Sequence, residues 1–171
     1  GIVGYMSGHA EQPMRIGHPD VIAELAEVLV EPITAAGGYT EHDGFAFRLI
    51  TYRMKEVYCT QGQNLPSLAA RRRYNPLLMH PDAMAAIDVS EYDTVVVRSG
   101  YGEVRATVEP SDELSPGTVA LAFGWGGPDD DGVNVQHLIA DDEQFDAVTG
   151  LALQSAVPVD VFAAERAPIP R

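Results

Sequence analysis

Basic side chains concentrate in one part of this sequence, where they could bind a small anion. Six of the eleven basic residues fall in a 26-residue stretch whose only acid is Glu56; they are Arg48, Arg53, Lys55, Arg71, Arg72 and Arg73. In a chain with a net charge of −14, such a stretch predicts a site for an anionic group. The alternative for residues 71–73 is a solvated helix face, or a surface that docks onto another part of a parent protein, and both interpretations stay open.

The overall charge and hydropathy exclude several classes of partner. A net charge of −14 would repel nucleic acid and anionic membrane before any specific contact formed. The longest apolar runs, such as residues 94–97 and 118–123, are far shorter than the roughly 20 residues that cross a bilayer. The 171 residues, of which 46% are hydrophobic, are enough for one core but not for a second full domain.

Cysteine content and the first residues indicate where the protein acts. The chain has a single cysteine, Cys59, which cannot form an internal disulfide. Residues 1–9 have neither a basic start nor a long apolar run, so they do not resemble a secretory signal. We therefore expect a cytoplasmic location.

Other reactive side chains fit structural roles better than catalytic ones. A lone cysteine is more often a small packed apolar residue than a ligand, and one thiolate cannot hold an iron–sulfur cluster. The acidic segments 129–131 and 141–143 do not have the ligand spacing of a calcium loop. The five histidines are not spaced as a zinc site, and no serine lies in a nucleophile-elbow sequence. We expect no metal ligand and no catalytic residue in this chain.

Helices are predicted where a proline and an acid precede apolar residues at helical spacing. His18-Pro19-Asp20 begins one amphipathic helix, and Pro81-Asp82 begins a short one. A further helix or turn is predicted near Pro66, and Pro76 interrupts the chain again.

Strands are predicted by short apolar runs with turn residues between them. They cover residues 45–51, 94–98, 103–108, 118–123 and 157–162. Residues 94–108 predict a hairpin, and we expect Gly100 and Gly102 to adopt backbone angles that a β-carbon disfavours. Several short strands with a few short helices between them indicate a small barrel, because closure removes exposed sheet edges.

Several motifs follow one another in a fixed order over residues 45–163, although no single motif is specific. They are Phe47-Arg48-Leu49-Ile50-Thr51-Tyr52-Arg53, Thr60-Gln61-Gly62, Tyr74-Asn75-Pro76-Leu77-Leu78-Met79-His80-Pro81-Asp82-Ala83, Tyr92-Asp93-Thr94-Val95-Val96-Val97-Arg98-Ser99-Gly100-Tyr101-Gly102-Glu103-Val104, Ser115-Pro116-Gly117-Thr118-Val119, Phe123-Gly124-Trp125-Gly126-Gly127 and Asp146-Ala147-Val148-Thr149-Gly150. In this order they resemble a known family, the molybdopterin dinucleotide-binding domain of the dimethyl-sulfoxide-reductase superfamily.

This resemblance implies a mainly β fold with short helices, a six-stranded double-psi β-barrel over residues 45–163. Residues 1–44 would be an arm whose helix resembles the one preceding this domain in full-length members, and residues 164–171 a tail. The chain would be the C-terminal domain of a molybdenum or tungsten oxidoreductase of the formate dehydrogenase or nitrate reductase type. It would bind molybdopterin guanine dinucleotide beside the parent's N-terminal catalytic domains, which supply the metal ligand, and it would not be catalytic alone.

The resemblance also implies which residues contact the cofactor. Thr51, Arg53, Thr60 and Gln61 would lie on one loop and Asn134 or Gln136 on another. A dinucleotide needs cationic or N–H donors for its pyrophosphate and amides for its rings, and the polar segment 60–64 provides amides. The sequence departs from the family pattern at Gln136, where an asparagine is usual, and at the glycine before Trp125, where a histidine is frequent.

Two other functions occur on the same barrel type. Aspartate decarboxylases of this barrel type cleave themselves at a Gly-Ser pair, and this chain contains no Gly-Ser. The second alternative is a protein-interaction module like the N-terminal domains of some hexameric ATPases. Nothing here resembles the linker of those ATPases, and such a module would have no use for the polar loop 60–64.

Overall fold

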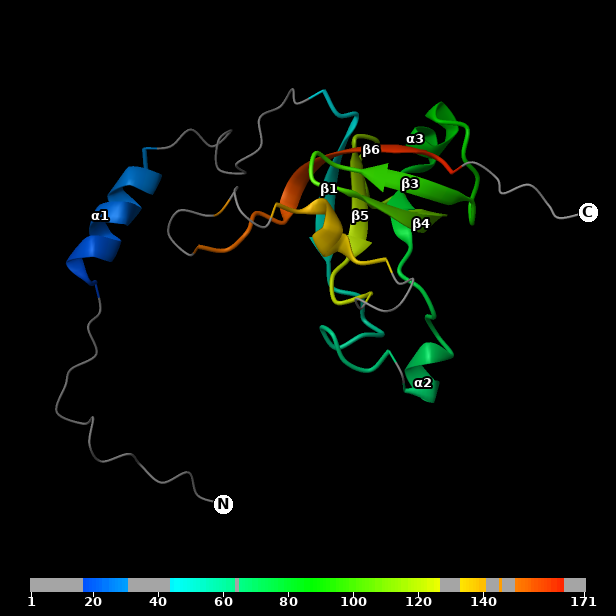
Figure 1. Cartoon of the computed structure of the whole chain (residues 1–171), viewed down its shortest axis with the longest axis horizontal. Helices are drawn as coiled ribbons and strands as arrows, with labels where there is room; N and C mark the ends of the chain where they lie inside the picture. Colours follow the sequence, from blue (N-terminus) through cyan, green and yellow to red (C-terminus); the bar gives the residue numbers. More distant parts are fainter. Residues whose placement is uncertain are drawn as a thin grey trace, which may run out of the picture.

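Six strands form a closed barrel in the computed structural model, which describes residues 17–30, 44–63, 65–126, 133–140, 145 and 150–164 (Figure 1). The acidic segments 129–131 and 141–143 lie outside the described residues, as do His9 and His42. The strands are β1 (Phe47–Tyr52), β2 (Leu77–Met79), β3 (Thr94–Arg98), β4 (Glu103–Pro110), β5 (Thr118–Ala122) and β6 (Ser155–Ala163).

The strand order around the barrel is β1-β5-β2-β4-β3-β6, and β6 closes it by pairing with β1. β1 runs parallel to β5 and β2 runs parallel to β4, whereas the other neighbouring pairs are antiparallel. The mainly β fold with a closed six-stranded double-psi barrel, expected from the sequence, is confirmed. The hairpin of β3 and β4 is also confirmed, with Val97 opposite Val104.

The core is formed by the buried residues that alternate with more exposed ones along the strands. In β4, Val104, Ala106 and Val108 are buried while their neighbours are half-buried or exposed, as expected for a strand with one face inward. The fully buried residues at the centre come from all six strands and from one short turn; they include Leu49, Leu77, Val97, Val108, Leu121, Leu138 and Val159.

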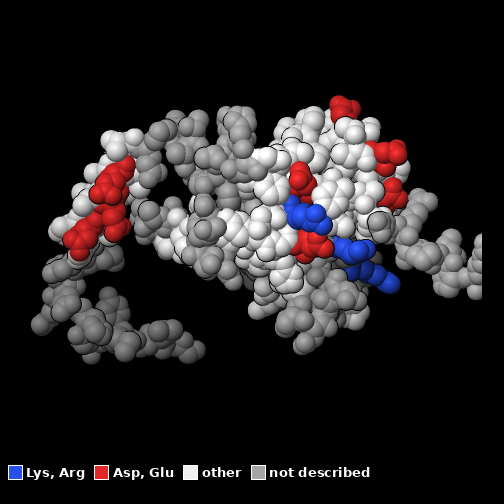
Figure 2. Space-filling model, turned by 45° about the horizontal axis from the view of Figure 1, so that its top comes forward, with Lys and Arg blue, Asp and Glu red and all other residues white. Residues whose placement is uncertain are grey.

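Three α-helices begin at a proline: α1 (Pro19–Val28), α2 (Pro66–Ala69) and α3 (Pro81–Ala86). The His-Pro-Asp sequence recurs at two of them, and in both the histidine Nδ1 accepts a hydrogen bond from the aspartate N–H, at 3.4 Å from Asp20 and 3.1 Å from Asp82. α1 has no buried residue, and its visible face carries acidic side chains (Figure 2). No helix in the described ranges has both the length and the apolar content needed to cross a bilayer.

The sequence patterns did not predict β2. Its three residues lie between Pro76 and Pro81 and are too few to show a periodicity. β2 is held by its neighbours, because Leu77 pairs with Val108 of β4 and Leu78 with Ala120 of β5. Tertiary pairing, which a local pattern does not encode, therefore determines this strand.

Candidate functional site

A cleft of about 530 Å³ opens where β5 ends, between two segments that are far apart in the sequence. One wall comes from the loop after β1 and the turn after β5. The other wall comes from η2 (Val135–Leu138), a single 3₁₀ turn, and from the residue just before it. The residues that line the cleft are Thr60, Gln63, Phe123, Gly124, Trp125, Gly126, Asn134, Gln136 and Gln154.

Gly124 lets the first wall close. Its φ of +82° is in the left-handed region, and a β-carbon there would lie 2.0 Å from the carbonyl oxygen of Cys59. No side chain fits in that space, so the turn after β5 rests directly on the backbone of the loop after β1. Gln63 stabilises this contact between the two loops, because its Nε2 donates a hydrogen bond to the Gly124 carbonyl.

Asn75 joins the two walls through its buried side chain. It is 1% exposed; its Nδ2 donates to the carbonyls of Ala122 at 2.8 Å and Val133 at 3.1 Å, and its Oδ1 accepts from the Ala122 N–H at 3.1 Å. Ala122 ends β5 just before one wall, and Val133 precedes the other. One buried side chain therefore links the segments that lead into the two walls, and the sequence patterns identify Asn75 only as part of a motif.

Asn134 holds the second wall in shape. Its Oδ1 accepts a hydrogen bond from the Gln136 N–H at 3.0 Å and so caps η2. The cap fixes the direction in which η2 leaves the barrel and presents Gln136, which is exposed, at the mouth of the cleft.

Gly102 supports η2 from the β3–β4 hairpin, which corrects an expectation. Neither Gly100 nor Gly102 has the positive φ that was predicted for them. A β-carbon on Gly102 would instead lie 2.5 Å from the carbonyl oxygen of His137, whereas one on Gly100 would meet nothing within 4 Å. The hairpin turn is formed by Ser99, whose Oγ accepts from the N–H of Tyr101 at 3.1 Å and of Gly102 at 3.3 Å. Glycine is needed at 102 for close approach, not for backbone conformation.

Trp125 is both a core residue and part of the cleft. It is 9% exposed and packs with Met54, Val57 and Ala122 in a small apolar cluster beside the main core. Its indole Nε1 is buried and has no hydrogen-bond partner within the described part of the chain. A buried donor left without a partner costs free energy, on the order of 1–3 kcal/mol.

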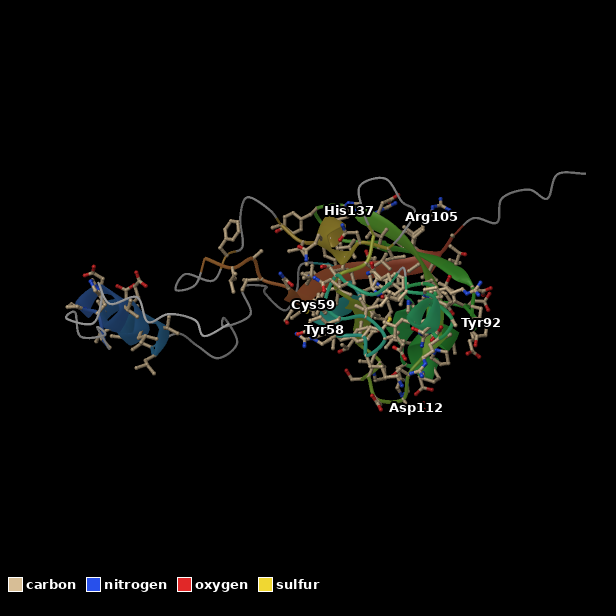
Figure 3. The ribbon with its side chains drawn as sticks, turned by 90° about the horizontal axis from the view of Figure 1, so that it is seen from below. Tyr58, Cys59, Tyr92, Arg105, Asp112 and His137 are labelled. Atoms are coloured by element: carbon tan, nitrogen blue, oxygen red, sulfur yellow. The ribbon has the colours of Figure 1, made fainter. Side chains whose placement is uncertain are left out.

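A second hollow of about 520 Å³ adjoins the cleft and shares Thr60 and Gln63 with it. It is lined in addition by Tyr58, Gln61, Gly62, Leu65 and Leu68. Tyr58 and Leu65 are exposed at 74% and 55%. Figure 3 shows the Tyr58–Cys59 loop and His137 at one end of the barrel, with Tyr92 at the other.

The structure brings together part of the predicted site. Thr60, Asn134 and Gln136 line the cleft, and Gln61 lines the adjoining hollow. Arg53 is exposed just after β1, with its guanidinium carbon 6.0 Å from the ring centroid of Phe123, a residue of the cleft. Thr51 lies within β1, paired with Leu121, and is not among the lining residues.

Arg72 belongs to a separate cluster, in which Arg72 and Tyr74 contact Glu109 of β4. Its Nη1 lies 2.7 Å from Glu109 Oε1, which also accepts a hydrogen bond from the Tyr74 hydroxyl. That hydrogen bond, together with partial burial, raises the pKa of Tyr74 to about 12. Burial also raises the pKa of nearby Tyr52 to about 12, although Arg72 opposes the shift. Arg72 is thus engaged by Glu109, while Arg53 lies beside the cleft.

Two glutamines of the lining could not be identified as site residues from sequence patterns. Gln63 is only one member of the polar loop, and Gln154 lies in an irregular segment before β6 that has no motif. With them the described lining contains four amides, one hydroxyl, two aromatic rings and no charged side chain. Such a surface can form many neutral hydrogen bonds but no ion pair.

Comparisons with known proteins agree with this geometry. The family model described as Molydopterin dinucleotide binding domain matches residues 47–154, which is more than half of the chain. No curated protein matches the sequence. Among solved structures, acetylene hydratase from Pelobacter acetylenicus is similar in fold, with a TM-score of 0.64 and 16% identity. The match covers 90% of this chain but only 20% of that one, so the chain spans about a fifth of the length of that relative. The chain belongs to the molybdopterin dinucleotide-binding domain family.

Proposed function

We propose that this chain binds molybdopterin guanine dinucleotide as the C-terminal domain of a molybdenum or tungsten oxidoreductase of the formate dehydrogenase or nitrate reductase type. The observation that carries the proposal is the convergence of Thr60, Asn134 and Gln136 on one cleft, since these are the segments that the family resemblance assigned to the cofactor. The chain holds the cofactor and is not catalytic alone.

The residues of the cleft fit such a group. Four amides and a threonine hydroxyl can pair with the exocyclic amino and carbonyl groups of the rings. The buried Nε1 donor of Trp125 lacks a partner among described residues and can serve an acceptor of the ligand. Arg53, beside Phe123 at the rim, is placed for the pyrophosphate.

When bound, the cofactor supplies a metal centre for two-electron or oxygen-atom transfer. The chain's own residues bind and orient it. The buried cluster of Met54, Val57, Ala122 and Trp125 backs the cleft and keeps water from that side, while Asn75 holds the two walls at a fixed separation.

The proposal also includes partner domains and a location. A relative five times as long as the matched region leaves room for separate catalytic domains, which would complete the site around the metal. We propose that these domains precede this one in a parent protein. We also propose a cytoplasmic location, which the single cysteine supports.

The proposal is tested in the parent enzyme by its cofactor content. The double variant Gln136→Ala with Gln154→Ala removes two of the four lining amides without touching the core. We expect it to retain less than about a tenth of the bound metal and guanine nucleotide, because each lost hydrogen bond costs on the order of 1 kcal/mol and leaves ligand groups unpaired. The matched control, His137→Ala with Asp112→Ala, changes two exposed residues outside the cleft and should retain both.

Full metal and nucleotide occupancy in the glutamine double variant would overturn the assignment of the cleft. The isolated chain should in addition transfer no electrons from formate or to nitrate with artificial carriers. Metal-dependent turnover by the chain alone would contradict its role as a binding domain.

A further inference from the structure

A phenol, a carboxylate and a guanidinium meet on the outer side of β4, outside the cleft. Oε1 of Glu109, a residue of β4, accepts a hydrogen bond from the Tyr74 hydroxyl and lies 2.7 Å from Arg72 Nη1. The guanidinium carbon of Arg72 is 5.8 Å from the centroid of the Tyr74 ring. None of these three residues lines the cleft or the adjoining hollow. The contacts therefore form a site of their own.

The Tyr74 phenol has a hydrogen-bond acceptor that is also a base. An ionised carboxylate has no proton to give, so the hydroxyl is the donor in this pair. This hydrogen bond, together with partial burial, raises the pKa of Tyr74 to about 12, so the phenol keeps its proton at neutral pH. The Glu109 side chain is 16% exposed, which limits the access of water to the pair. A proton that leaves Tyr74 therefore passes to Glu109.

A base in contact with a phenol favours the loss of an electron from it. A phenol that loses one electron becomes a radical cation, which is a very strong acid, so oxidation at neutral pH proceeds most easily where a base takes up the proton. Tyr52 lacks such a partner: burial raises its pKa to about 12, and its hydroxyl donates no hydrogen bond to a described residue. Of these two half-buried tyrosines, Tyr74 is thus the one equipped for oxidation.

Oxidisable side chains connect this pair with the cleft. Trp125 lines the cleft and belongs to the small apolar cluster beside the main core, and Tyr52 packs against the same cluster. Tyr52 is also close enough to Arg72 and Glu109 for their charges to act on its pKa, which Arg72 lowers and Glu109 raises. Indole and phenol rings exchange electrons through packed contacts of this kind. The packing therefore provides a route from Trp125 through Tyr52 to Tyr74.

We propose that Tyr74 is a redox-active tyrosine that takes over an oxidising equivalent formed at Trp125, with Glu109 as its proton acceptor. A small one-electron oxidant in the cleft removes one electron from the Trp125 indole, whose Nε1 proton leaves to solvent. Tyr74 then gives one electron to Trp125, which recovers a proton from solvent, while the Tyr74 hydroxyl proton moves to Glu109.

The products of the second step are the restored indole, a neutral tyrosyl radical and a protonated carboxyl group. A thiolate reductant in solution resets the site, because it supplies the electron while Glu109 returns the proton. The site would move oxidative damage from the cleft to a replaceable electron donor. The inference goes beyond the proposed function and holds whichever ligand the cleft takes.

Trp125 makes the test direct, because it is the only tryptophan in the chain. Pulse radiolysis of the whole 171-residue chain in azide solution generates the azide radical, a small one-electron oxidant that reacts preferentially with tryptophan. Tryptophanyl and tyrosyl radicals have different absorption bands, so the decay of one and the growth of the other are followed in the same sample. A rate that does not depend on protein concentration identifies transfer within one molecule.

The tyrosyl radical should grow at the rate at which the tryptophanyl radical decays, and more slowly in D₂O because a proton moves with the electron. Tyr74→Phe keeps the ring beside Arg72 but has no hydroxyl, so transfer should be at least about tenfold slower. Glu109→Gln keeps an oxygen that accepts the hydrogen bond but is not a base, so it should also slow transfer at least about tenfold. A purely structural role of Glu109 would leave the rate in a folded Glu109→Gln chain unchanged.

Tyr58→Phe and Tyr92→Phe are the control variants, because these two tyrosines are the alternative electron donors. Tyr58 lines the hollow that adjoins the cleft and is 74% exposed. Tyr92 is 64% exposed, and a hydrogen bond to Glu91 raises its pKa, so it also has a carboxylate beside it. Both variants should transfer as fast as the parent sequence does. Thermal melts establish that each variant is folded.

Three results would overturn the proposal. One is unchanged transfer in Tyr74→Phe or in Glu109→Gln. A second is slow transfer in Tyr58→Phe or Tyr92→Phe in place of Tyr74→Phe. The third is a folded parent chain in which the tryptophanyl radical decays without forming a tyrosyl radical. The proposed function is judged separately, by the metal and nucleotide content of the parent enzyme.

Discussion

Asn75 and Ala122 are joined by hydrogen bonds in both directions: the Asn75 Nδ2 donates to the Ala122 carbonyl at 2.8 Å, and its Oδ1 accepts from the Ala122 N–H at 3.1 Å. A buried asparagine thus takes the place of a backbone partner at the end of β5. A third hydrogen bond joins the Asn75 Nδ2 to the Val133 carbonyl at 3.1 Å and so links Ala122 to the segment that precedes the second wall of the cleft.

The variant Asn75→Ala should lower the free energy of unfolding by about 2–4 kcal/mol, because it removes the side-chain partner of two buried backbone groups of Ala122 and of the half-buried Val133 carbonyl. Urea denaturation measures the change. Asp112→Ala, at an exposed turn position, is the control and should change stability by less than about 0.5 kcal/mol. Equal stability of Asn75→Ala and the control would show that the walls are held by other contacts.

Gly102 and Gly100 form a matched pair in one hairpin. Gly102→Ala should lower the melting temperature by several degrees, because its β-carbon would lie 2.5 Å from the backbone oxygen of His137. Relieving this overlap requires a shift of the backbone, which costs more free energy than the rotation of a side chain. Gly100→Ala meets nothing within 4 Å and should change the melting temperature little. A thermal melt in which both variants behave alike would refute the close-approach explanation.

Ala156 has a φ of +60°, and it lies where the pairing of β6 with β1 shifts register. A left-handed conformation costs an L-residue roughly 1–2 kcal/mol, a cost that glycine avoids. Ala156→Gly should therefore stabilise the chain by about 0.5–1 kcal/mol in urea denaturation, after the greater chain entropy of glycine is subtracted. Ala85→Gly, in the exposed face of α3, should instead destabilise it by a similar amount. A loss of stability in Ala156→Gly would contradict the explanation that the positive φ of Ala156 strains the backbone.

The alkaline stability of the fold should depend on Tyr52. Burial raises its pKa to about 12 from the ordinary value of 10. Because the folded state favours the protonated phenol, this contribution is complete below pH 10 and is lost as the pH rises from 10 toward 12. The free energy of unfolding should fall across this window, and Tyr52→Phe, which cannot ionise, should fall less steeply. An unchanged pH profile in Tyr52→Phe would show that Tyr52 does not contribute.

More of the barrel than of the site could be predicted from the sequence. Residues 94–108 contain alternation and turn residues within one local stretch, so the β3–β4 hairpin followed from the sequence. β2 did not, because three residues between two prolines have no periodicity and depend on distant partners. The angles expected of Gly100 and Gly102 were wrong for a similar reason: the partner that requires glycine is the backbone of His137, 35 residues away along the chain.

The same distinction applies to the cleft. Thr60, Asn134 and Gln136 could be assigned to the site because they belong to segments that resemble the family and follow its order along the sequence. Gln154 has no motif around it, and its position in the lining results from the closure of β6 onto β1. The role of Asn75 depends on two carbonyls that only the folded chain brings together.

Arg53 and Arg72 provide the last prediction, since they come from the same basic stretch but have different surroundings. Arg72 is 2.7 Å from Glu109 and also faces the Tyr74 ring, so its charge is already neutralised. Arg53 is exposed, with its guanidinium 6.0 Å from the ring of Phe123 in the cleft lining, and its side chain is free to turn toward a phosphate. In the parent enzyme, Arg53→Ala should therefore lower metal and guanine nucleotide content several-fold, as expected for the loss of a charge-assisted hydrogen bond of about 1.5–3 kcal/mol. Arg72→Ala should lower thermal stability slightly and leave the cofactor content unchanged. Elemental analysis and nucleotide release on both variants distinguish the two arginines, and full occupancy in Arg53→Ala with loss in Arg72→Ala would reverse their ranking.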